Sequence, residues 1–267
     1  MTGFKDKYGP WALITGASSG IGAEFARQVA AQGLNLVLVA RREERLRSLA
    51  RALEAAHPIQ VKIIPVDLTT TDFLPVIQQA TDDLEIGLLV NNAGVMPTGR
   101  FLDQDLENEL RQLDLNSRAP LILAHHFGRQ MAERGRGGML FLASMVAFQG
   151  TPSVAHYAAT KAFDLVLAEG LHVELKPAGV DVLALAPGFT ATELADHFDF
   201  SGSPIKPMRV EPVVQAALQA LGRRSLVIPG WQNRFLYWMV KHLLPRPANT
   251  AVFGKIFGTL LREVPHV

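Results

Sequence analysis

Tyr157 and Lys161 lie four residues apart in a segment with the apolar spacing of a helix, so we expect their side chains on one helical face. A tyrosine hydroxyl ordinarily titrates near pH ~10, and a neighbouring ammonium favours the phenolate and lowers that pKa. Such a pair can move a proton near neutral pH, as an acid in a reduction or a base in an oxidation. Most Tyr-Lys pairs at this spacing are surface pairs, so the assignment depends on the residues around them.

Two further polar residues could complete a site around this pair. Ser144 follows an apolar strand predicted over residues 138–143, and a side chain at the carboxyl end of such a strand faces the ligand crevice of α/β proteins. Its hydroxyl can donate to a carbonyl oxygen as negative charge develops there. Asn116 lies in a helix predicted over residues 106–133. Its amide could hold a water that links Lys161 to solvent, or it is an ordinary polar helix position.

A glycine-rich segment, TGASSGIG at residues 15–22, lies between a predicted strand at 11–14 and a predicted helix at 24–32. Strand, glycine turn and helix form the context in which such a motif binds phosphate. Gly16 can adopt backbone angles closed to other residues, and the free N–H groups at the helix start can hold an anion. Gly22 lets the helix pack closely on the strand. Taken alone, the motif could also be a flexible loop.

The end of the predicted strand at residues 36–40 indicates which nucleotide would bind. An acid about 20 residues past the glycines would bind the free 2′-hydroxyl of NAD, but here Arg41 and Arg42 precede the first acid, Glu43. A guanidinium pairs with a 2′-phosphate, which a carboxylate would repel. We therefore predict NADP(H), with Arg41 as the main contact and Arg42 as a second. The alternative, a solvated helix start, is more reasonable for Arg42.

Apolar strands alternate with helical patterns along the chain. The predicted strands are residues 11–14, 36–40, 61–66, 86–90, 138–143, 180–186 and 226–228, and the helices are 24–32, 43–56, 74–81, 106–133, 153–176 and 212–221. Continuous apolar strands separated by helices indicate a parallel sheet covered on both faces. Right-handed crossovers then give a three-layer, doubly wound α/β fold with about seven strands, which we place in residues 1–230.

The composition suits one such domain and excludes several functions. The chain has 267 residues, 48% hydrophobic and 19% charged, which is enough to bury a large core. A net charge of +1 gives no electrostatic case for nucleic acid. Without cysteine or a metal-type histidine motif, we expect no metal. Residues 1–10 lack a signal-peptide core, and no apolar run reaches the roughly 18 residues of a spanning helix. We therefore expect a cytoplasmic protein.

These motifs occur in the order and spacing of one family. TGASSGIG at 15–22, NNAG at 91–94, Asn116, Ser144, Tyr157-x-x-x-Lys161 and PG at 187–188 resemble the short-chain dehydrogenase/reductase family over roughly residues 10 to 230. The resemblance implies a Rossmann fold, hydride transfer with NAD(P)(H) and an Asn-Ser-Tyr-Lys tetrad. Tyr157 would be the acid/base, and Lys161 would tune it and bind the nicotinamide ribose. Ser144 would polarise the carbonyl, and Asn116 would support a proton relay.

The residue patterns and the resemblance together predict the cofactor site. Its members are Gly16, Ser18, Ser19, Gly20, Ile21, Gly22, Arg41, Arg42, Asp67, Leu68, Asn92, Ala93, Gly94, Tyr157, Lys161, Pro187, Gly188, Thr190 and Thr192. The resemblance implies that Asp67 meets the adenine, although an Asp after a strand is more often a helix cap. It also implies that residues 187–192 hold the nicotinamide carboxamide. We expect a small carbonyl or alcohol substrate and a homodimer or homotetramer.

Substrate specificity is expected in the loop at 189–210 and the tail at 231–267. In the loop, Phe198 and Phe200 could cover an apolar substrate or be buried where the loop folds back. The tail contains two amphipathic helical patterns separated by Pro-Arg-Pro at 245–247, and residues 225–267 hold five Lys or Arg and one acid. We expect this helical extension to pack on the same domain, over the pocket or in a subunit interface. A minority alternative places residues 231–262 on an anionic membrane surface.

Two other functions are open on the sequence. Residues 16–20 fit G-x-S-x-G, the nucleophile elbow of α/β hydrolases, with Ser18 as nucleophile and a histidine such as His172 downstream. We disfavour this esterase because the motif follows the first strand, which leaves no upstream strand for an oxyanion loop. It also leaves the arginines and Tyr157 unexplained. A nucleotide-binding protein without catalysis is the third reading, and the intact tetrad argues against it.

Overall fold

In the computed structural model, which describes residues 3–203 and 205–261, seven parallel strands form one sheet. The strands are β1 (Trp11–Thr15), β2 (Asn35–Ala40), β3 (Val61–Pro65), β4 (Ile86–Asn91), β5 (Gly137–Leu142), β6 (Val180–Leu185) and β7 (Leu226–Val227). Their order is β3-β2-β1-β4-β5-β6-β7, which confirms the predicted doubly wound sheet. The order reverses between β1 and β4, and such a reversal opens a ligand crevice at the carboxyl ends of the strands.

Helices cover both faces of this sheet. The residues on the two faces come from α2, α3 and α8 on one side and from α4, α6 and α7 on the other. The α-helices are α1 (Phe4–Tyr8), α2 (Gly20–Ala31), α3 (Glu43–Ala56), α4 (Phe73–Thr81), α5 (Leu106–Leu113), α6 (Ala119–Arg134), α7 (Ala155–Leu175), α8 (Val210–Ala220), α9 (Trp231–His242) and α10 (Arg246–Leu260). Shorter segments are the π-helical η2 (Asp114–Arg118) and the 3₁₀ turns η1 (Phe101–Asp103), η3 (Met145–Phe148), η4 (Lys176–Ala178) and η5 (Glu193–His197). None of the helices in the described ranges is long and apolar enough to cross a membrane.

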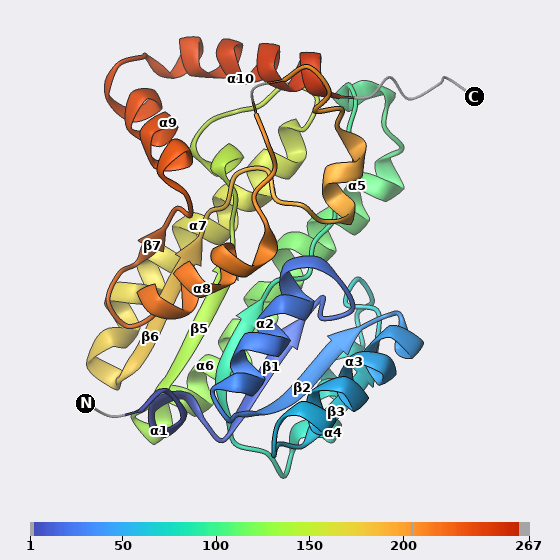
Figure 1. Cartoon of the computed structure of the whole chain (residues 1–267), viewed down its shortest axis with the longest axis vertical. Coiled ribbons are helices and arrows are strands. Elements are labelled where there is room, and N and C mark those ends of the chain that lie inside the picture. Colours follow the sequence, from blue (N-terminus) through green and yellow to red (C-terminus); the bar gives the residue numbers. More distant parts are fainter. Residues whose placement is uncertain (1–2, 204, 262–267) are drawn as a thin grey trace.

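The alternation of side chains along each strand divides the core into two layers. On β1, Leu13 belongs to the cluster with residues of α4, α6 and α7, whereas Ile14 belongs to the cluster with residues of α2, α3 and α8. Successive strand residues point to opposite faces of a sheet, so each apolar strand fills both layers. Figure 1 shows this sandwich of helices, sheet and helices.

One predicted helix is interrupted at a site residue. The single helix expected over residues 106–133 is instead α5, the π-helical η2 and α6, and Asn116 lies within η2. A π-helical turn bonds each residue to the fifth along the chain and often marks a functional site. Apolar periodicity does not report such a change in hydrogen bonding, because the residues before and after it keep a helical pattern.

The tail forms the two expected helices, α9 and α10, which lie beyond the carboxyl ends of the strands (Figure 1). Val240 and Phe253 share an apolar cluster with Phe198, which is 2% exposed. Of the two alternatives open for Phe198, the structure shows the buried one. On α9, Phe235 is 54% exposed, while Tyr237 packs on the ring of Phe148.

Parts of the tail predictions remain predictions. Residues 262–267 of the extension, and residue 262 of the membrane alternative, lie outside the described residues. The boundary at residue 230 and the membrane contact also stay predictions.

Candidate active site

The turn after β1 requires glycine at two positions. Gly16 has a φ of +66°, and a Cβ atom there would lie 2.9 Å from the Cα atom of Ala93. A Cβ atom on Gly22 would lie 2.4 Å from the Gly16 carbonyl oxygen, so α2 packs directly on the turn. Ser19, the N-cap of α2, makes no side-chain capping bond. The first N–H groups of α2 can therefore bind an anion.

Thr15 and Asn92 hold this turn against the end of β4. The Thr15 hydroxyl accepts from the backbone N–H groups of Asn92 and Ala93, each at 3.0 Å, and donates to the Val90 carbonyl at 3.2 Å. The Asn92 amide donates to the Thr15 carbonyl at 2.8 Å. The Asn92 side chain therefore braces the turn, and Thr15 is a site residue that the sequence did not single out.

A cavity of about 550 Å³ opens where β1, β2 and β4 end. Its lining contains most of the positions predicted to bind the cofactor, namely Gly16, Ser18, Ser19, Gly20, Ile21, Arg41, Arg42, Asp67, Leu68, Asn92, Ala93, Gly94 and Thr192. A glycine cradle, a helix N-terminus and two guanidinium groups along one cavity suit a dinucleotide that carries several phosphates. The residues present therefore fit a nicotinamide dinucleotide.

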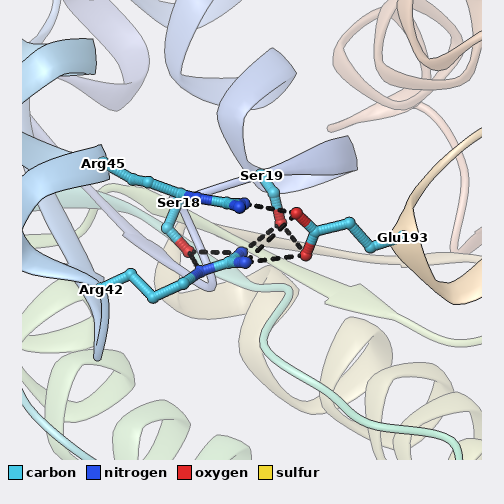
Figure 2. A network of polar contacts seen from close by, with 5 residues as sticks. All are labelled: Ser18, Ser19, Arg42, Arg45 and Glu193. Atoms are coloured by element: carbon cyan, nitrogen blue, oxygen red, sulfur yellow. Dashed lines mark hydrogen bonds and ion pairs between the residues drawn. The ribbon is translucent and has the colours of Figure 1, made fainter.

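Arg42 lies on the glycine turn. Its Nε and Nη2 atoms donate to Ser18 Oγ at 3.2 and 3.0 Å, and Nη2 also donates to Ser19 Oγ at 2.7 Å (Figure 2). Arg41 is 61% exposed and lies 3.9 Å from the carboxylate of Asp67. The second of the two arginines, expected to be the lesser contact, thus has the closer contacts with the turn.

Asp67 shapes the segment after β3. Its carboxylate accepts from the Thr69 N–H at 3.0 Å and the Thr69 hydroxyl at 2.9 Å. Burial acts to raise the pKa of Asp67, but the Thr69 hydrogen bonds and the charges of Arg41 and Arg111 outweigh it and hold the pKa below its ordinary value. Asp67 is therefore ionised on the cavity wall, and it is not a helix cap, because α4 begins later, with Asp72 as its N-cap. Its contact with an adenine stays a prediction.

Asn116 is fully buried and joins the loop after β4 to α7. Its Oδ1 accepts from the Val95 N–H and its Nδ2 donates to the Val95 carbonyl, both at 2.9 Å. Nδ2 also donates to the Thr160 hydroxyl at 3.1 Å. Both amide hydrogens are used, so a water could bind this amide only through the remaining lone pair of Oδ1. The proton relay through Asn116 stays a prediction.

Ser144 and Tyr157 meet where β5 ends and α7 begins. Ser144 is the N-cap of η3, and its Oγ accepts from the Val146 N–H at 3.4 Å. Burial raises the pKa of Tyr157 above its ordinary value, although the Lys161 ammonium and a hydrogen bond with Ser144 act to lower it. The expectation that Lys161 would lower this pKa is wrong in its net direction, because it omitted the cost of removing a phenolate from water.

Lys161 is 3% exposed and held from two sides. Its Nζ atom donates to the Leu142 carbonyl at 2.6 Å and to Asp164 Oδ2 at 3.0 Å. Burial acts to lower the pKa of Lys161, but Asp164 and Tyr157 outweigh it, so the pKa is raised and the ammonium persists at neutral pH. These contacts use two of its three hydrogens. The third can serve a ligand beside Gly94, where a Cβ atom would lie 3.6 Å from Nζ.

The segment after β6 reaches across to the glycine turn. A Cβ atom on Gly188 would lie 2.5 Å from Asn233 Oδ1, so the approach of α9 requires glycine there. Thr190 donates to the Gly188 carbonyl at 3.0 Å, and Thr192 donates to the Thr190 carbonyl at 3.3 Å. A Cβ atom on Gly20 would lie 3.0 Å from Thr192 Cγ2. The predicted carboxamide segment therefore lies at the edge of the cavity.

This architecture has known relatives. Residues 10–199 match the family model described as short chain dehydrogenase. The chain belongs to the short-chain dehydrogenase family. A 7β-hydroxysteroid dehydrogenase from Clostridium sardiniense is 30% identical over 86% of this chain and 89% of its own length. A very-long-chain 3-oxoacyl-CoA reductase-like protein from Arabidopsis thaliana is 33% identical over 90% of this chain and 78% of its own length.

Solved structures of short-chain dehydrogenases have a similar fold. A 7β-hydroxysteroid dehydrogenase has a TM-score of 0.87 and 28% identity, covering 94% of this chain and 99% of its own. A short-chain dehydrogenase from Sphingobium yanoikuyae in complex with NADPH has a TM-score of 0.79 and 33% identity, covering 97% and 98%. The predicted family and Rossmann-type fold are thus confirmed.

This short-chain dehydrogenase also has site groups that sequence reasoning missed. Asp164 follows Lys161 by three residues on one helix, and that spacing was a readable signal. Glu193 contacts Arg42 and Arg45, which are about 150 residues away in the chain, and no local pattern links them. Across the described ranges, no group of three or more His, Cys, Asp or Glu side chains is placed to hold a metal.

Proposed function

We propose that this short-chain dehydrogenase is an NADP(H)-dependent oxidoreductase that interconverts a ketone and an alcohol, with reduction as its direction in a cell. The observation that carries the proposal is the junction of two groups at one cavity. Arg41 and Arg42 line its outer part. The buried Lys161 donates to the carbonyl of Leu142, which lines the inner part of the same cavity. Lys161 acts on the pKa of Tyr157, which is hydrogen-bonded with Ser144.

The charge at the end of β2 supports NADP(H) over NAD(H). Arg41 and Arg42 stand where an acid would bind the free ribose hydroxyl of NAD. Guanidinium groups form strong charge-assisted bonds with phosphate. The similar Sphingobium yanoikuyae enzyme was solved in complex with NADPH, which supports the same preference here.

The chain's own residues would supply the proton and the positioning. When bound, NADPH would supply the hydride. Ser144 would donate a hydrogen bond to the substrate oxygen, and Tyr157 would give that oxygen its phenolic proton. Lys161, kept charged by Asp164, would stabilise the phenolate and hold a ribose hydroxyl with its third hydrogen. Asn116 would hold the loop after β4 in a fixed position against α7.

We propose an apolar carbonyl compound as the substrate class. Phe198 packs on Phe189 and Phe257 with ring centroids 4.9 and 5.5 Å apart, which puts an aromatic cluster beside the loop that follows the site. Similar proteins include 7β-hydroxysteroid dehydrogenases and a bulky-bulky ketone specific alcohol dehydrogenase from Comamonas testosteroni at 32% identity. Their names support a bulky apolar ketone as the class to test first.

A fluorescence titration of the purified protein with NADPH and NADH tests the proposal. We expect NADPH to bind more tightly, and Arg41→Ala to lose about tenfold of that affinity, because a charge-assisted bond is removed. Arg51→Ala, at an exposed position on α3, the helix that follows Arg41, is the matched control and should bind normally. Tighter NADH binding would reject the arginine argument, and binding of neither would reject the site.

The esterase alternative has less support. Ser18 Oγ receives two hydrogen bonds from Arg42, and a guanidinium cannot accept the serine proton. His172 contacts the Val182 carbonyl at 2.8 Å through Nδ1. Labelling of Ser18 by a fluorophosphonate would restore this alternative.

A nucleotide-binding protein without turnover is the second alternative. One similar human protein, 31% identical over 73% of this chain and 60% of its own length, is named inactive hydroxysteroid dehydrogenase-like protein 1. The chain has all four residues expected of the tetrad, Asn116, Ser144, Tyr157 and Lys161, which supports an active enzyme. Tight NADPH binding without turnover of any ketone would favour the alternative.

We also propose a homo-oligomer built on α5 and α7. Phe163, Val166 and Val173 on α7 are 38%, 66% and 70% exposed, and Leu106 and Leu110 on α5 are 69% and 53% exposed. Apolar side chains gathered on neighbouring helices are typical of a subunit interface.

A further inference from the structure

A carboxylate from the segment after β6 lies on the arginines that follow β2. Glu193 opens η5, and its two oxygens accept from Arg42 Nη1 at 3.2 and 2.9 Å. One oxygen also contacts Arg45 Nη1, and the other accepts from Ser19 Oγ at 3.3 Å. Figure 2 shows the carboxylate facing both guanidinium groups while Arg42 stays on the hydroxyls of Ser18 and Ser19.

These donors are the ones that a phosphate would use. Two guanidinium groups and a serine hydroxyl converge on a pair of anionic oxygens, and phosphate is bound by the same kinds of group. Ser18, Ser19, Arg42 and Glu193 all line the cavity. Glu193 therefore supplies negative charge at the place where the proposed function puts the ribose 2′-phosphate.

We propose that Glu193 competes with the 2′-phosphate for Arg42 and Arg45, and so sets how strongly the protein prefers the phosphorylated dinucleotide. This inference rests on the proposed function. It assigns a role in cofactor specificity to Glu193, which contacts the arginines from the segment after β6. Arg45, in the first turn of α3, would then bind the phosphate together with Arg42.

The competition is reversible because the network is exposed. The side chains of Glu193, Arg42 and Arg45 are 51%, 41% and 52% exposed, and water screens ion pairs of this kind. A phosphate monoester carries a charge of roughly −1.5 to −2 at neutral pH, more than one carboxylate. Hydrogen bonds from Arg45 and Arg42 hold the pKa of Glu193 below its ordinary value. The carboxylate is thus ionised, and it competes, throughout the neutral range.

The same contact ties cofactor charge to the substrate loop. Residues 193–197 form η5, and the next residue, Phe198, bridges Leu261 and packs on Phe257 of α10. The segment is therefore held at Glu193 by the arginines and at Phe198 by the tail. When a phosphate binds Arg42 and Arg45, the contact at Glu193 is released and the contact at Phe198 remains.

The test compares nucleotide affinity in matched variants. We expect Glu193→Gln to bind NADPH about two- to fivefold more tightly, the range expected when one exposed ion-pair competitor is removed, with NADH affinity unchanged. Glu44→Gln is the control. It removes an equal charge from an exposed side chain on α3 that forms no ion pair with these arginines in the described part of the chain. It should leave the ratio of the two affinities as in the wild type.

A double variant tests whether the effect of Glu193 depends on its contact with Arg42. In an Arg42→Ala background, Glu193→Gln should have a clearly smaller effect, because residues in contact are energetically coupled. Weaker NADPH binding in Glu193→Gln, or an equal change for both nucleotides, would overturn the inference. The quantity compared is the change in affinity for each nucleotide between the wild type and the variant. A wild type that prefers NADH would contradict the proposed function while leaving this comparison intact.

Hydrogen exchange tests the link to the loop. In the wild type, 2′,5′-ADP should speed exchange at residues 193–198 relative to 5′-AMP, because only the former carries the competing phosphate. Glu193→Gln should exchange quickly with either probe. Slower or equal exchange in the wild type with 2′,5′-ADP would contradict the release of Glu193.

Discussion

The Lys161 ammonium lies 3.0 Å from the Asp164 carboxylate, one helical turn further along α7, and the two side chains are 4% and 3% exposed. Burial raises the pKa of Asp164 to about 6, although the ammonium acts against that rise. The Asp164 charge also acts to raise the pKa of Tyr157. The electrostatics of the proposed acid/base therefore depend on a buried carboxylate that is not among the residues lining the cofactor cavity.

Replacing Asp164 should lower the pKa of Tyr157. Asp164→Asn removes a negative charge that disfavours the phenolate, and the amide keeps a similar shape. The measurement is the tyrosinate absorbance titration of each protein minus that of its Tyr157→Phe counterpart. An unchanged or higher Tyr157 pKa would mean that Asp164 does not act on the phenol.

Asp164 should also shape the dependence of stability on pH. Its folded pKa of about 6 lies above the ordinary 3.8, so the folded state binds more protons between these values and loses stability as pH rises through them. The free energy of unfolding of the wild type, relative to Asp164→Asn, should fall by about 1–3 kcal/mol from pH 4 to 6. Urea unfolding across this range measures it, and a rise with pH would contradict the assignment.

Loss of the Tyr157 hydroxyl should stop turnover but spare binding. Tyr157→Phe should lower kcat by about 10²- to 10⁴-fold, the usual contribution of a positioned proton donor, with NADPH affinity nearly unchanged. Tyr237→Phe, on α9 against Phe148, is the control and should keep turnover. Normal turnover in Tyr157→Phe would remove this residue from the mechanism.

Asn116 should contribute strongly to stability. Asn116→Ala would leave the half-buried Val95 N–H and carbonyl without this partner and would open a gap at a fully buried position, so we expect a loss of about 2–4 kcal/mol in the free energy of unfolding. Thr160→Val keeps both bonds to Val95 and removes the bond from Asn116 and a local bond from Thr160 to the Tyr157 carbonyl, so it should cost about 1 kcal/mol. Urea denaturation compares them, and equal losses would show that Asn116 is not the cross-link we describe.

The exposed face of α7 should control assembly. Val166→Glu places a charge on an apolar side chain that is 66% exposed, and should shift the oligomer to monomer by sedimentation velocity, because burying an unpaired charge is costly. Val76→Glu, at a 43% exposed position on α4, should leave the oligomer intact. A monomeric wild type would reject the proposed interface.

Patterns within a few residues determined much of this protein. Apolar runs marked the strands, glycines in the turn after β1 marked an anion site, and four-residue spacing placed Tyr157 and Lys161 on one face of α7. A doubly wound sheet of about seven strands also followed, because crossover handedness and short connections leave few arrangements of alternating strands and helices. These features depend on interactions between neighbours in sequence, which a single chain displays directly.

Only the tertiary structure decided the contacts that set the chemistry. Asn116 uses its amide on Val95 within a π-helical turn, and Glu193 meets Arg42 across 151 residues of chain. Burial rather than Lys161 sets the net direction of the Tyr157 pKa. A sequence period reports which side chains share a face. Which element packs against that face, and how much water the face loses, depend on how distant elements pack. Burial and long-range charge pairing therefore emerge only with the assembled fold.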